Sequence, residues 1–420
     1  MKRFTTILML CAGWLSVNAQ TESTIKVNDE LSNKEQLIGL PESMTTHVDS
    51  LMMRWEMKHF LYTDKEHANG ENREATPEEM QERLRRIPAL IEMPYNNAVK
   101  ECIDKFSTTL RDNVSAILGA GNLYIPLFEE TLDRFGLPLE LKYLPVVESS
   151  LDPLAGKTSG NAGLWQLSLS IAERYGLKVN SLVDERRDPI KSTEAACKYL
   201  SDLYKIYKDW NLVIAAYNCD PINVNKAIHY AGGKKDYWAI YPFLPQDGRG
   251  YVPAFIAANY IMNFYCEHGI RPMMTKYPVK TDTLVISRNL HMEQIEALCG
   301  IEKEAIKSLN PQYRTEVIPG ENQVCNLRLP QDILLKFIDN QDSVYNYKSK
   351  DLLTRRAVVS IDEKVIAKQR EASKAKYITI RRGDTLGAIA ARNHTTVGAI
   401  KRLNGMRSDR INPGKRLRVR

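Results

Sequence analysis

The sequence predicts a multidomain protein in which a mainly α-helical domain is followed by two small α+β modules of βααβ order. Apolar residues recur at three- and four-residue steps from about Asn97, and alternating strand patterns are nearly absent from residues 137–265. After about residue 276, short strand patterns flank pairs of helical patterns, and this arrangement occurs twice. A composition of 43% hydrophobic and 26% charged residues allows a buried core and argues against gross disorder.

The helical domain starts with a strongly periodic segment over residues 99–117, which indicates an amphipathic helix. Gly119-Ala120-Gly121 is expected to end this helix. A second helix over residues 124–134 is expected to stop before Gly136. Further helices are expected over residues 139–149, 164–175, 193–208, 212–217 and 252–265.

Residues 20–96 form a polar N-terminal extension with weaker patterns. One helix is expected near residues 48–62. Thr76-Pro77-Glu78-Glu79 predicts another helix start, because Thr caps, Pro suits the first turn and a Glu lies three residues after the cap. The main helical domain is then expected over residues 97–275.

The two modules share a plan and several sequence elements. Strands are expected over residues 279–286, 325–329, 377–380 and 416–419, and helices over 292–298, 303–309, 385–392 and 397–403. In both modules an Asp-Thr-Leu, a Leu-Asn and a Pro-Gly follow in the same order. This repetition predicts duplicated modules over residues 276–335 and 377–420, separated by a basic linker over residues 336–376.

Residues 1–19 have the pattern of an export signal. Lys2 and Arg3 precede an apolar run over residues 7–17, and Val17-Asn18-Ala19 offers a cleavage site with small residues. A membrane anchor is the alternative, but the run is short for crossing a bilayer. Bulky Leu10 before Cys11 disfavours a lipoprotein signal. The sequence therefore predicts an exported protein.

Removal of residues 1–19 takes away two positive charges and no acidic ones, so the net charge falls from +7 to +5. A mildly basic exported protein suits an anionic polymer, and export argues against nucleic acid as the partner. The remaining cysteines show no CxxC pair and no metal-ligand spacing, so we expect no metal and no cofactor. Cys299 and Cys325 are the best candidates for a disulfide, and buried free thiols are the alternative.

Ordered motifs along residues 136–253 resemble the lytic transglycosylases of the soluble-lytic-transglycosylase type. The matching pieces are Gly136-Leu137-Pro138, Leu144-Pro145-Val146-Val147-Glu148-Ser149, Gly163-Leu164-Trp165-Gln166, Tyr175-Gly176-Leu177, Asp184-Glu185-Arg186-Arg187-Asp188-Pro189, Ala216-Tyr217-Asn218 and Tyr251-Val252-Pro253. The resemblance implies a lysozyme-like fold for the helical domain. It also implies a periplasmic, cell-wall-associated enzyme, with association at the outer membrane left open.

Residues 377–420 resemble a LysM module through Gly383-Asp384-Thr385-Leu386, Ile389-Ala390, Leu403-Asn404 and Pro413-Gly414. Residues 279–330 resemble a degenerate module of the same kind. The resemblance implies binding of N-acetylglucosamine-containing glycan. Eleven Lys and Arg against two Asp in residues 377–420 suit an anionic wall, and nucleic acid is the rival interpretation of that charge.

The resemblance implies that Glu148 is the catalytic acid and base. It would protonate the β-1,4 bond between N-acetylmuramic acid and N-acetylglucosamine in peptidoglycan. It would then take the C6 hydroxyl proton, and a 1,6-anhydro end would form without water. Glu148 ends the apolar run 144–147, which should raise its pKa by desolvation. On pattern alone, a Glu at a helix end is usually a solvated surface residue.

The same resemblance makes Gln166, Tyr217, Asn218 and Tyr251 candidate substrate-binding residues. Their amides could hold sugar substituents, and the tyrosines could stack on a sugar or position Glu148. Trp165 could lie in the cleft or in the core. Without the resemblance, each would be a helix-end or packing residue.

The sequence departs from the family in places. Family members carry a Ser nine residues after the catalytic Glu, but Lys157 stands here, and Ser159 just beyond is a further candidate substrate-binding residue. A Lys157 cation that pointed inward would lower the pKa of Glu148. Cys219 replaces the usual Gly after Ala-Tyr-Asn, and Asp247 replaces a Glu.

These departures leave two alternatives to a lytic transglycosylase acting in wall remodelling or turnover. One is a catalytically impaired peptidoglycan-binding protein. The other is a lysozyme-like hydrolase with Asp152 as second carboxylate, although Leu151-Asp152-Pro153 is typical of a turn. Oligomeric state and association with a complex at the wall or outer membrane stay open.

Overall fold

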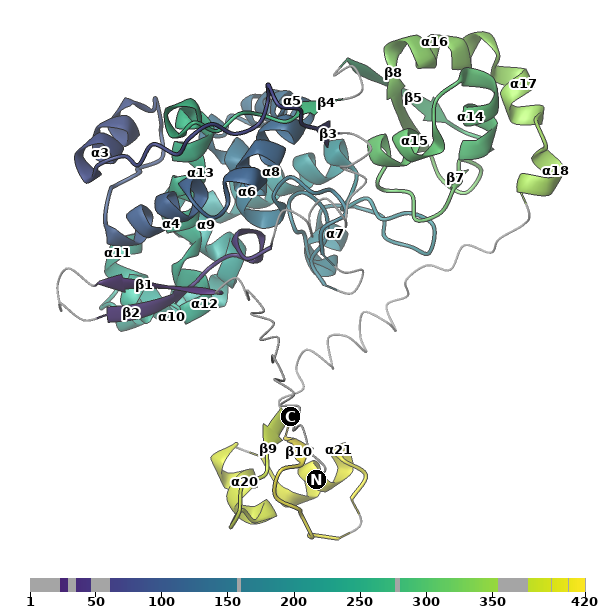
Figure 1. The fold of residues 1–420 in the computed structure, drawn as a ribbon. Coiled ribbons are helices and arrows are strands. Elements are labelled where there is room, and N and C mark those ends of the chain that lie inside the picture. Colours follow the sequence, from purple (N-terminus) through teal and green to yellow (C-terminus); the bar gives the residue numbers. More distant parts are fainter. Residues whose placement is uncertain are drawn as a thin grey trace, which may run out of the picture.

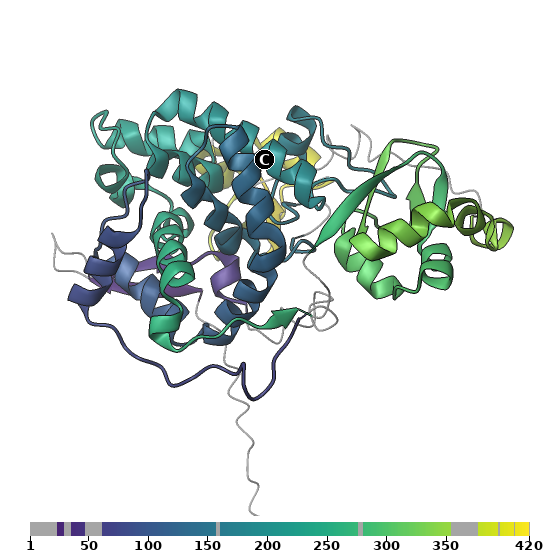
Figure 2. The same cartoon turned by 90° about the horizontal axis from the view of Figure 1, so that it is seen from above.

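The computed structural model describes residues 23–28, 35–46, 61–156, 160–275, 280–353, 377–393, 395–406 and 408–419. Helices of the first part form one body, and a smaller module that combines strands and helices lies beside it in both views (Figures 1 and 2). The last module has its own core of Ile380, Leu386, Ile389, Ala390, Ile400, Leu417 and Val419. The exported leader expected at residues 1–19 lies outside the described residues.

The helical domain is built around one almost fully buried helix, α13 (Tyr251–Phe264), which contacts α4, α6 and α9. A helix that is apolar on all sides is suited to the centre of a domain. The surrounding helices are α3 (Pro77–Arg86), α4 (Asn97–Ser107), α5 (Arg111–Arg134), α6 (Leu144–Ser149), α7 (Leu169–Arg174), α8 (Pro189–Tyr207), α9 (Trp210–Cys219), α10 (Pro221–Tyr230), α11 (Tyr237–Ile240) and α12 (Gln246–Arg249). The prediction of a mainly helical domain is confirmed.

The predicted break at Gly119-Ala120-Gly121 is wrong. The chain breaks instead at residues 108–110, between α4 and α5, and α5 runs through both glycines. Gly119 is needed for close packing, because a Cβ there would lie 2.7 Å from the carbonyl oxygen of Met273. Tertiary contact outweighs the low helix propensity of glycine at this position.

The N-terminal extension is more ordered than its polar sequence indicates. Strands β1 (Thr24–Asn28) and β2 (Glu35–Gly39) pair antiparallel, and the 3₁₀ helix η1 (Glu42–Met44) follows. The capped helix start is confirmed in α3, where Thr76 and Glu79 form a reciprocal capping box. Most of the helix expected near residues 48–62 lies outside the described residues, and Leu61–Tyr62 form strand β3, paired with β4 (Met274–Thr275).

The two modules have the predicted strand, helix, helix, strand order. The first contains β5 (Thr281–Ile286), β6 (Asn289–His291), α14 (Met292–Cys299), α15 (Lys303–Leu309), β7 (Val317–Pro319) and β8 (Cys325–Pro330). The second contains β9 (Tyr377–Thr379), α20 (Leu386–Arg392), α21 (Val397–Leu403) and β10 (Arg416–Arg418). Strand β5 pairs with β8, and β9 pairs with β10, both antiparallel.

One asparagine performs the same task in both modules, which explains the repeated Leu-Asn. The Asn310 side chain donates to the carbonyl of Arg328 and accepts from its N–H, both at 2.8 Å. The Asn404 side chain makes the same two hydrogen bonds with Arg418, at 2.7 and 2.9 Å. In each module, this amide joins the end of the second helix to the last strand.

The basic linker expected over residues 336–376 begins later than its charge indicates. Helices α16 (Gln331–Asp339) and α17 (Gln341–Asn346) pack onto the first module, where Phe337 and Tyr345 belong to its core. A short helix, α18 (Ser349–Leu352), follows, and residues 354–376 lie outside the described part. The apolar positions of these helices, rather than their charges, determine where they lie.

All six cysteines of the described residues are free thiols. The expected Cys299–Cys325 disulfide is therefore wrong. Both side chains are buried in the core of the first module, where a thiol packs as a small apolar group. Within the described residues, none of the helices is both long and apolar enough to cross a membrane.

The helical domain and the first module meet around a buried carboxylate, Asp184. Its side chain is fully buried and pairs with Arg186, also fully buried, at 2.8 Å, and with Arg314 of the module at 3.0 Å. Burial acts to raise the pKa of Asp184, but the hydrogen bond and charge of Arg186 and the charge of Arg314 outweigh it and lower the pKa. Asp188, at the end of the same motif, caps α8 through the N–H groups of Ile190 and Lys191.

Asp184→Asn is expected to lower the free energy of unfolding of the helical domain by about 3 kcal/mol, because it leaves the buried Arg186 cation uncompensated. All five tryptophans precede residue 239, so urea denaturation followed by tryptophan fluorescence reports on this domain. Glu194→Gln is the matched control, since it removes an exposed partner of Arg134 and should cost less than about 1 kcal/mol. Equal losses in the two variants would contradict the role given to Asp184.

Candidate active site

Glu148 lies at the C-terminal end of α6 and borders a cavity. Four apolar residues precede it in the helix, Leu144, Pro145, Val146 and Val147, and all four are buried. The Glu148 side chain keeps some exposure toward the cavity. It accepts a hydrogen bond at Oε1 from the hydroxyl of Tyr251, a buried residue at the start of α13.

The pKa of Glu148 is raised to about 8, chiefly because its surroundings withhold water from the ionised form. The Tyr251 hydrogen bond acts in the opposite direction and limits the rise. A carboxylic acid with this pKa is about nine-tenths protonated at pH 7 and can still ionise. The group can therefore both give and take a proton near neutral pH.

Glu148 is presented by a tight turn in which two successive non-glycine residues have positive φ. Ser150 and Leu151 have φ values of 54° and 59°. Such backbone is costly and persists only where the surrounding structure holds it. Here the N–H groups of both residues donate to carbonyls of α6, and Leu151 is fully buried in the core.

The turn over residues 163–166 lies against α6. The Ser149 hydroxyl donates to the carbonyl of Leu164 at 2.9 Å. Gly163 has a φ of 83°, and a Cβ there would lie 1.9 Å from the carbonyl oxygen of Arg186, so only glycine fits. Gln166 also has a positive φ, of 46°, and lines the cavity beside Glu148.

Tyr217 and Asn218 come from the end of α9, and they differ in their surroundings. The Tyr217 hydroxyl donates to the carbonyl of Trp165 at 2.7 Å, which joins α9 to the 163–166 turn. Burial, followed by the nearby Glu148 charge, raises the pKa of Tyr217, so the two side chains are close. Asn218 is exposed and does not line the Glu148 cavity.

Trp165 is a core residue. Its side chain is fully buried, meets Phe128 edge-on with ring centroids 5.2 Å apart, and donates to the Thr193 hydroxyl at 2.8 Å. Ser159 and Lys157 lie outside the described residues. The structure therefore brings Glu148, Gln166, Tyr217 and Tyr251 together and leaves Asn218 at the exposed end of α9.

The sequence prediction missed a contribution from the N-terminal segment 39–46. Glu42, Ser43 and Thr46 line the same cavity as Glu148. The Ser43 hydroxyl donates to the carbonyl of Val147, and Met44 is fully buried in the core of the helical domain. A Cβ on Gly250 would lie 2.0 Å from the carbonyl oxygen of Gly39. The apolar Leu40 and Met44, both in the core of the helical domain, were the signals in this mainly polar segment.

Asp152 is the other carboxylate of the helical domain beside Glu148 in this cavity. It is buried, and its Oδ1 accepts the N–H of Leu154 at 2.8 Å, while its carbonyl accepts the N–H of Ala155. Asp152 therefore shapes the turn after Glu148, as the sequence predicted. Among the described residues, no cluster of His, Cys, Asp and Glu could hold a metal ion.

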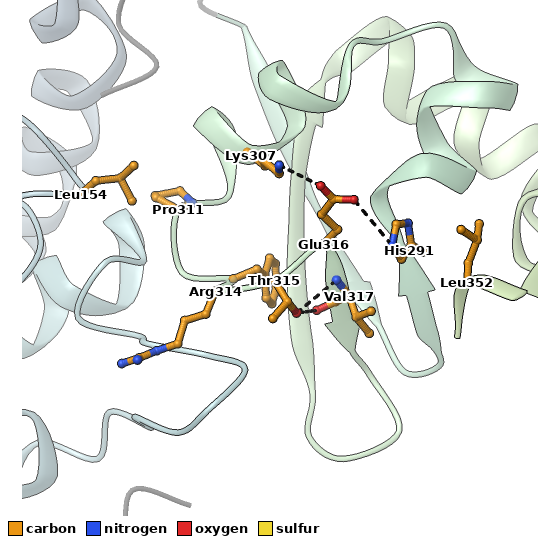
Figure 3. A pocket seen from close by; sticks show the side chains of 10 residues that line it. Leu154, His291, Lys307, Pro311, Arg314, Thr315, Glu316, Val317 and Leu352 are labelled. Carbon is orange, nitrogen blue, oxygen red and sulfur yellow. Dashed lines mark hydrogen bonds and ion pairs between the residues drawn. The ribbon is translucent and has the colours of Figure 1, made fainter. Parts of the chain in front are cut away.

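A second and larger cavity, of about 530 Å³, lies where the helical domain meets the first module (Figure 3). Leu154 of the helical domain lies across from Pro311, and Glu316 lies between Lys307 and His291. The other lining residues are Tyr313, Arg314, Thr315, Val317 and Leu352. Arg314 points away toward the helical domain, in agreement with its ion pair to Asp184.

Three parts of the chain match family models. Residues 126–240 match the Transglycosylase SLT domain, residues 280–346 the LysM-like domain of lytic transglycosylase MltD, and residues 378–420 the LysM domain. The LysM-like match extends to residue 346, in agreement with the packing of α16 and α17 onto that module.

The chain is also similar to individual proteins. Membrane-bound lytic murein transglycosylase D of Escherichia coli K12 is 29% identical over 333 residues, which cover 78% of this chain and 70% of that protein. Membrane-bound lytic murein transglycosylase F of Maricaulis maris is 36% identical over 129 residues, 27% of this chain and 26% of that protein. The solved 70 kDa soluble lytic transglycosylase of Escherichia coli aligns with 18% identity and a TM-score of 0.31, over 41% of this chain and 30% of its own.

The helical domain is thus a transglycosylase domain of the SLT type, with a lysozyme-like fold. The chain combines this domain with a LysM-like domain and a LysM domain, and these matches support lytic transglycosylase activity on peptidoglycan. The resemblance of the sequence motifs to lytic transglycosylases of the soluble-lytic-transglycosylase type is confirmed, and membrane-bound lytic murein transglycosylase D is among the similar proteins.

The Tyr251 hydrogen bond gives a prediction for pH dependence. In the wild type, kcat/KM should fall as pH rises through about 8, because Glu148 loses the proton that it donates. Tyr251→Phe removes the bond that lowers this pKa, so the alkaline limb should move to higher pH while the rate at pH 7 falls roughly tenfold. Tyr62→Phe, at an exposed tyrosine, is the control. An unchanged or lowered alkaline limb in Tyr251→Phe would contradict the assignment.

Proposed function

We propose that this enzyme cleaves the β-1,4 bond between N-acetylmuramic acid and N-acetylglucosamine with Glu148 as both acid and base. The observation that carries the proposal is the raised pKa of Glu148 beside a hydrogen-bonding tyrosine. The name of its relative, membrane-bound lytic murein transglycosylase D, supports peptidoglycan as the substrate.

In the first step, the protonated Glu148 carboxyl donates its proton to the glycosidic oxygen. The bond from C1 to this oxygen breaks, and positive charge develops at C1 of the N-acetylmuramic acid. In the second step, the Glu148 carboxylate takes the proton of the C6 hydroxyl, and that oxygen bonds to C1. A 1,6-anhydro end forms, the Glu148 proton is restored, and no water is consumed.

The neighbouring residues have supporting roles in this proposal. Tyr251 holds the Glu148 carboxyl through its hydroxyl, and Tyr217 holds the backbone that presents Gln166. The amide of Gln166 donates to the Gly163 carbonyl at 2.8 Å, which leaves its oxygen for a sugar substituent. Asn218, at the exposed end of α9, would contact a sugar unit farther from the cleaved bond, and Ser159 stays a candidate substrate-binding residue.

The setting of the enzyme follows from its domains. A LysM domain after the catalytic domain would bind N-acetylglucosamine-containing glycan and raise the local substrate concentration. We place the enzyme in the periplasm at the cell wall, in remodelling or turnover of peptidoglycan. The export signal expected at residues 1–19 and the name of the relative, membrane-bound lytic murein transglycosylase D, support this location.

Glu148→Gln should abolish release of anhydro-muropeptides from sacculi while leaving sacculus binding intact. The glutamine amide keeps the size of the side chain but cannot donate a proton to the leaving oxygen or accept one afterwards. Mass spectrometry of the digests measures the products, and pelleting with sacculi measures binding. Anhydro ends differ from reducing ends by the loss of one water, so reducing ends alone from the wild type would instead indicate a hydrolase that uses Asp152.

Deletion of residues 377–420 should weaken sacculus binding much more than cleavage of short soluble glycans. The LysM domain has its own core, separate from that of the catalytic domain, so its removal leaves the active site intact. Pelleting assays and product formation from soluble glycans are compared for the full and shortened chains. An equal loss in both assays would argue that residues 377–420 support the catalytic domain itself.

A further inference from the structure

The cavity between the catalytic domain and the LysM-like domain is held in a fixed position. The Asp184 N–H donates to the carbonyl of Gln312 at 2.8 Å, and the Arg314 N–H donates to the carbonyl of Leu182 at 2.9 Å. The side chains of Leu182 and Val183 enter the core of the LysM-like domain. Backbone hydrogen bonds and shared core therefore fix loop 311–317 against the catalytic domain, and the cavity is formed before any ligand arrives.

This cavity lies next to the catalytic one. Asp152, Ala155 and Gly156 line the Glu148 cavity, while Leu154 of the same turn lines the larger cavity. Two residues of extended chain span at most about 7 Å. The two cavities are therefore close enough for one strand to reach both of them.

The charges of the larger cavity favour a ligand with a carboxylate. Glu316 pairs with Lys307 at 3.0 Å, and His291 lies 3.7 Å away (Figure 3). Lys303, which lies outside the lining of the cavity, also pairs with Glu316, at 3.1 Å. Two ammonium groups thus face one carboxylate, and both lysine side chains keep a quarter to a third of their exposure. The excess positive charge is accessible to a ligand, and its effect is stronger in a recessed site than on an open surface.

The rest of the lining suits aliphatic groups. Leu154, Pro311, Val317 and Leu352 surround the charged cluster. A ligand that fits both features is short, partly aliphatic and carries free carboxylates. The peptide stems of peptidoglycan have this chemistry, whereas the glycan backbone offers mainly hydroxyl and acetamido groups.

We infer that the cavity between the two domains binds the peptide stem of the strand that is being cleaved, with Lys307 holding a stem carboxylate. This inference rests on the proposed function and adds a substrate preference to it. A strand without stems also carries a carboxylate, on the lactyl group of N-acetylmuramic acid. The experiment distinguishes binding of this lactyl carboxylate from binding of a stem carboxylate.

The test compares soluble glycan strands of matched length with their stems and after an amidase has removed them. The full chain and its variants are assayed for kcat and KM by quantifying anhydro products. Lys307→Gln should raise KM on stem-bearing strands roughly three- to fivefold and leave kcat and the stripped strands unchanged. Glu316→Gln removes the competing carboxylate and should lower KM on stem-bearing strands.

Opposite effects of the two variants distinguish ligand binding from a structural role, which would impair both variants in the same direction. Lys336→Gln, at an exposed lysine of α16, is the control. Equal changes on stem-bearing and stripped strands, or no change on either, would overturn the inference. The proposed function fails separately, if the wild type releases no anhydro products from either kind of strand.

Discussion

The buried ion pair between Asp184 and Arg186 supports two parts of the structure. These are the 163–166 turn beside Glu148 and the contact between the catalytic domain and the LysM-like domain. The Arg186 guanidinium also donates to the carbonyls of Gly160 at 2.7 Å and Leu167 at 3.4 Å, which enclose the turn that presents Gln166. The Asp184 carboxylate and backbone reach Arg314 and Gln312 of the LysM-like domain. Burial of two charges costs free energy of folding. The contribution of this ion pair is therefore that it fixes the positions of two separate loops.

At Glu148, opposing effects set the pKa of the single carboxyl to which we assign both proton transfers. Desolvation by the apolar helix α6 raises its pKa, and the Tyr251 hydroxyl lowers it. Desolvation alone would favour the acid and make the later base step difficult. The hydrogen bond alone would favour the carboxylate and remove the acid. A pKa of about 8 lies between these limits.

The sequence could predict whatever depends on local pattern. The capping box of α3, helices α15 and α21 and the paired module strands follow from periodicity and end signals. The family resemblance of the motifs was needed to predict the candidate site residues Glu148, Gln166 and Tyr251. Long-range contact decided the rest. Gly119 stays helical because Met273 packs on it, and Cys299 and Cys325 are buried in the core of the LysM-like domain as unpaired thiols.

The contributions that the sequence hid come from segments far from Glu148 along the chain. The N-terminal segment 39–46 reaches the cavity through Met44 and Ser43, and the LysM-like domain reaches the neighbouring turn through Arg314 and Pro311. Neither lies within residues 126–240, which match the SLT domain. We assign the chemistry of Glu148 to the SLT domain, and the flanking segments form other parts of the cavity walls. In our proposals, these flanking segments determine which parts of a strand, glycan or stem, the enzyme contacts before it cuts.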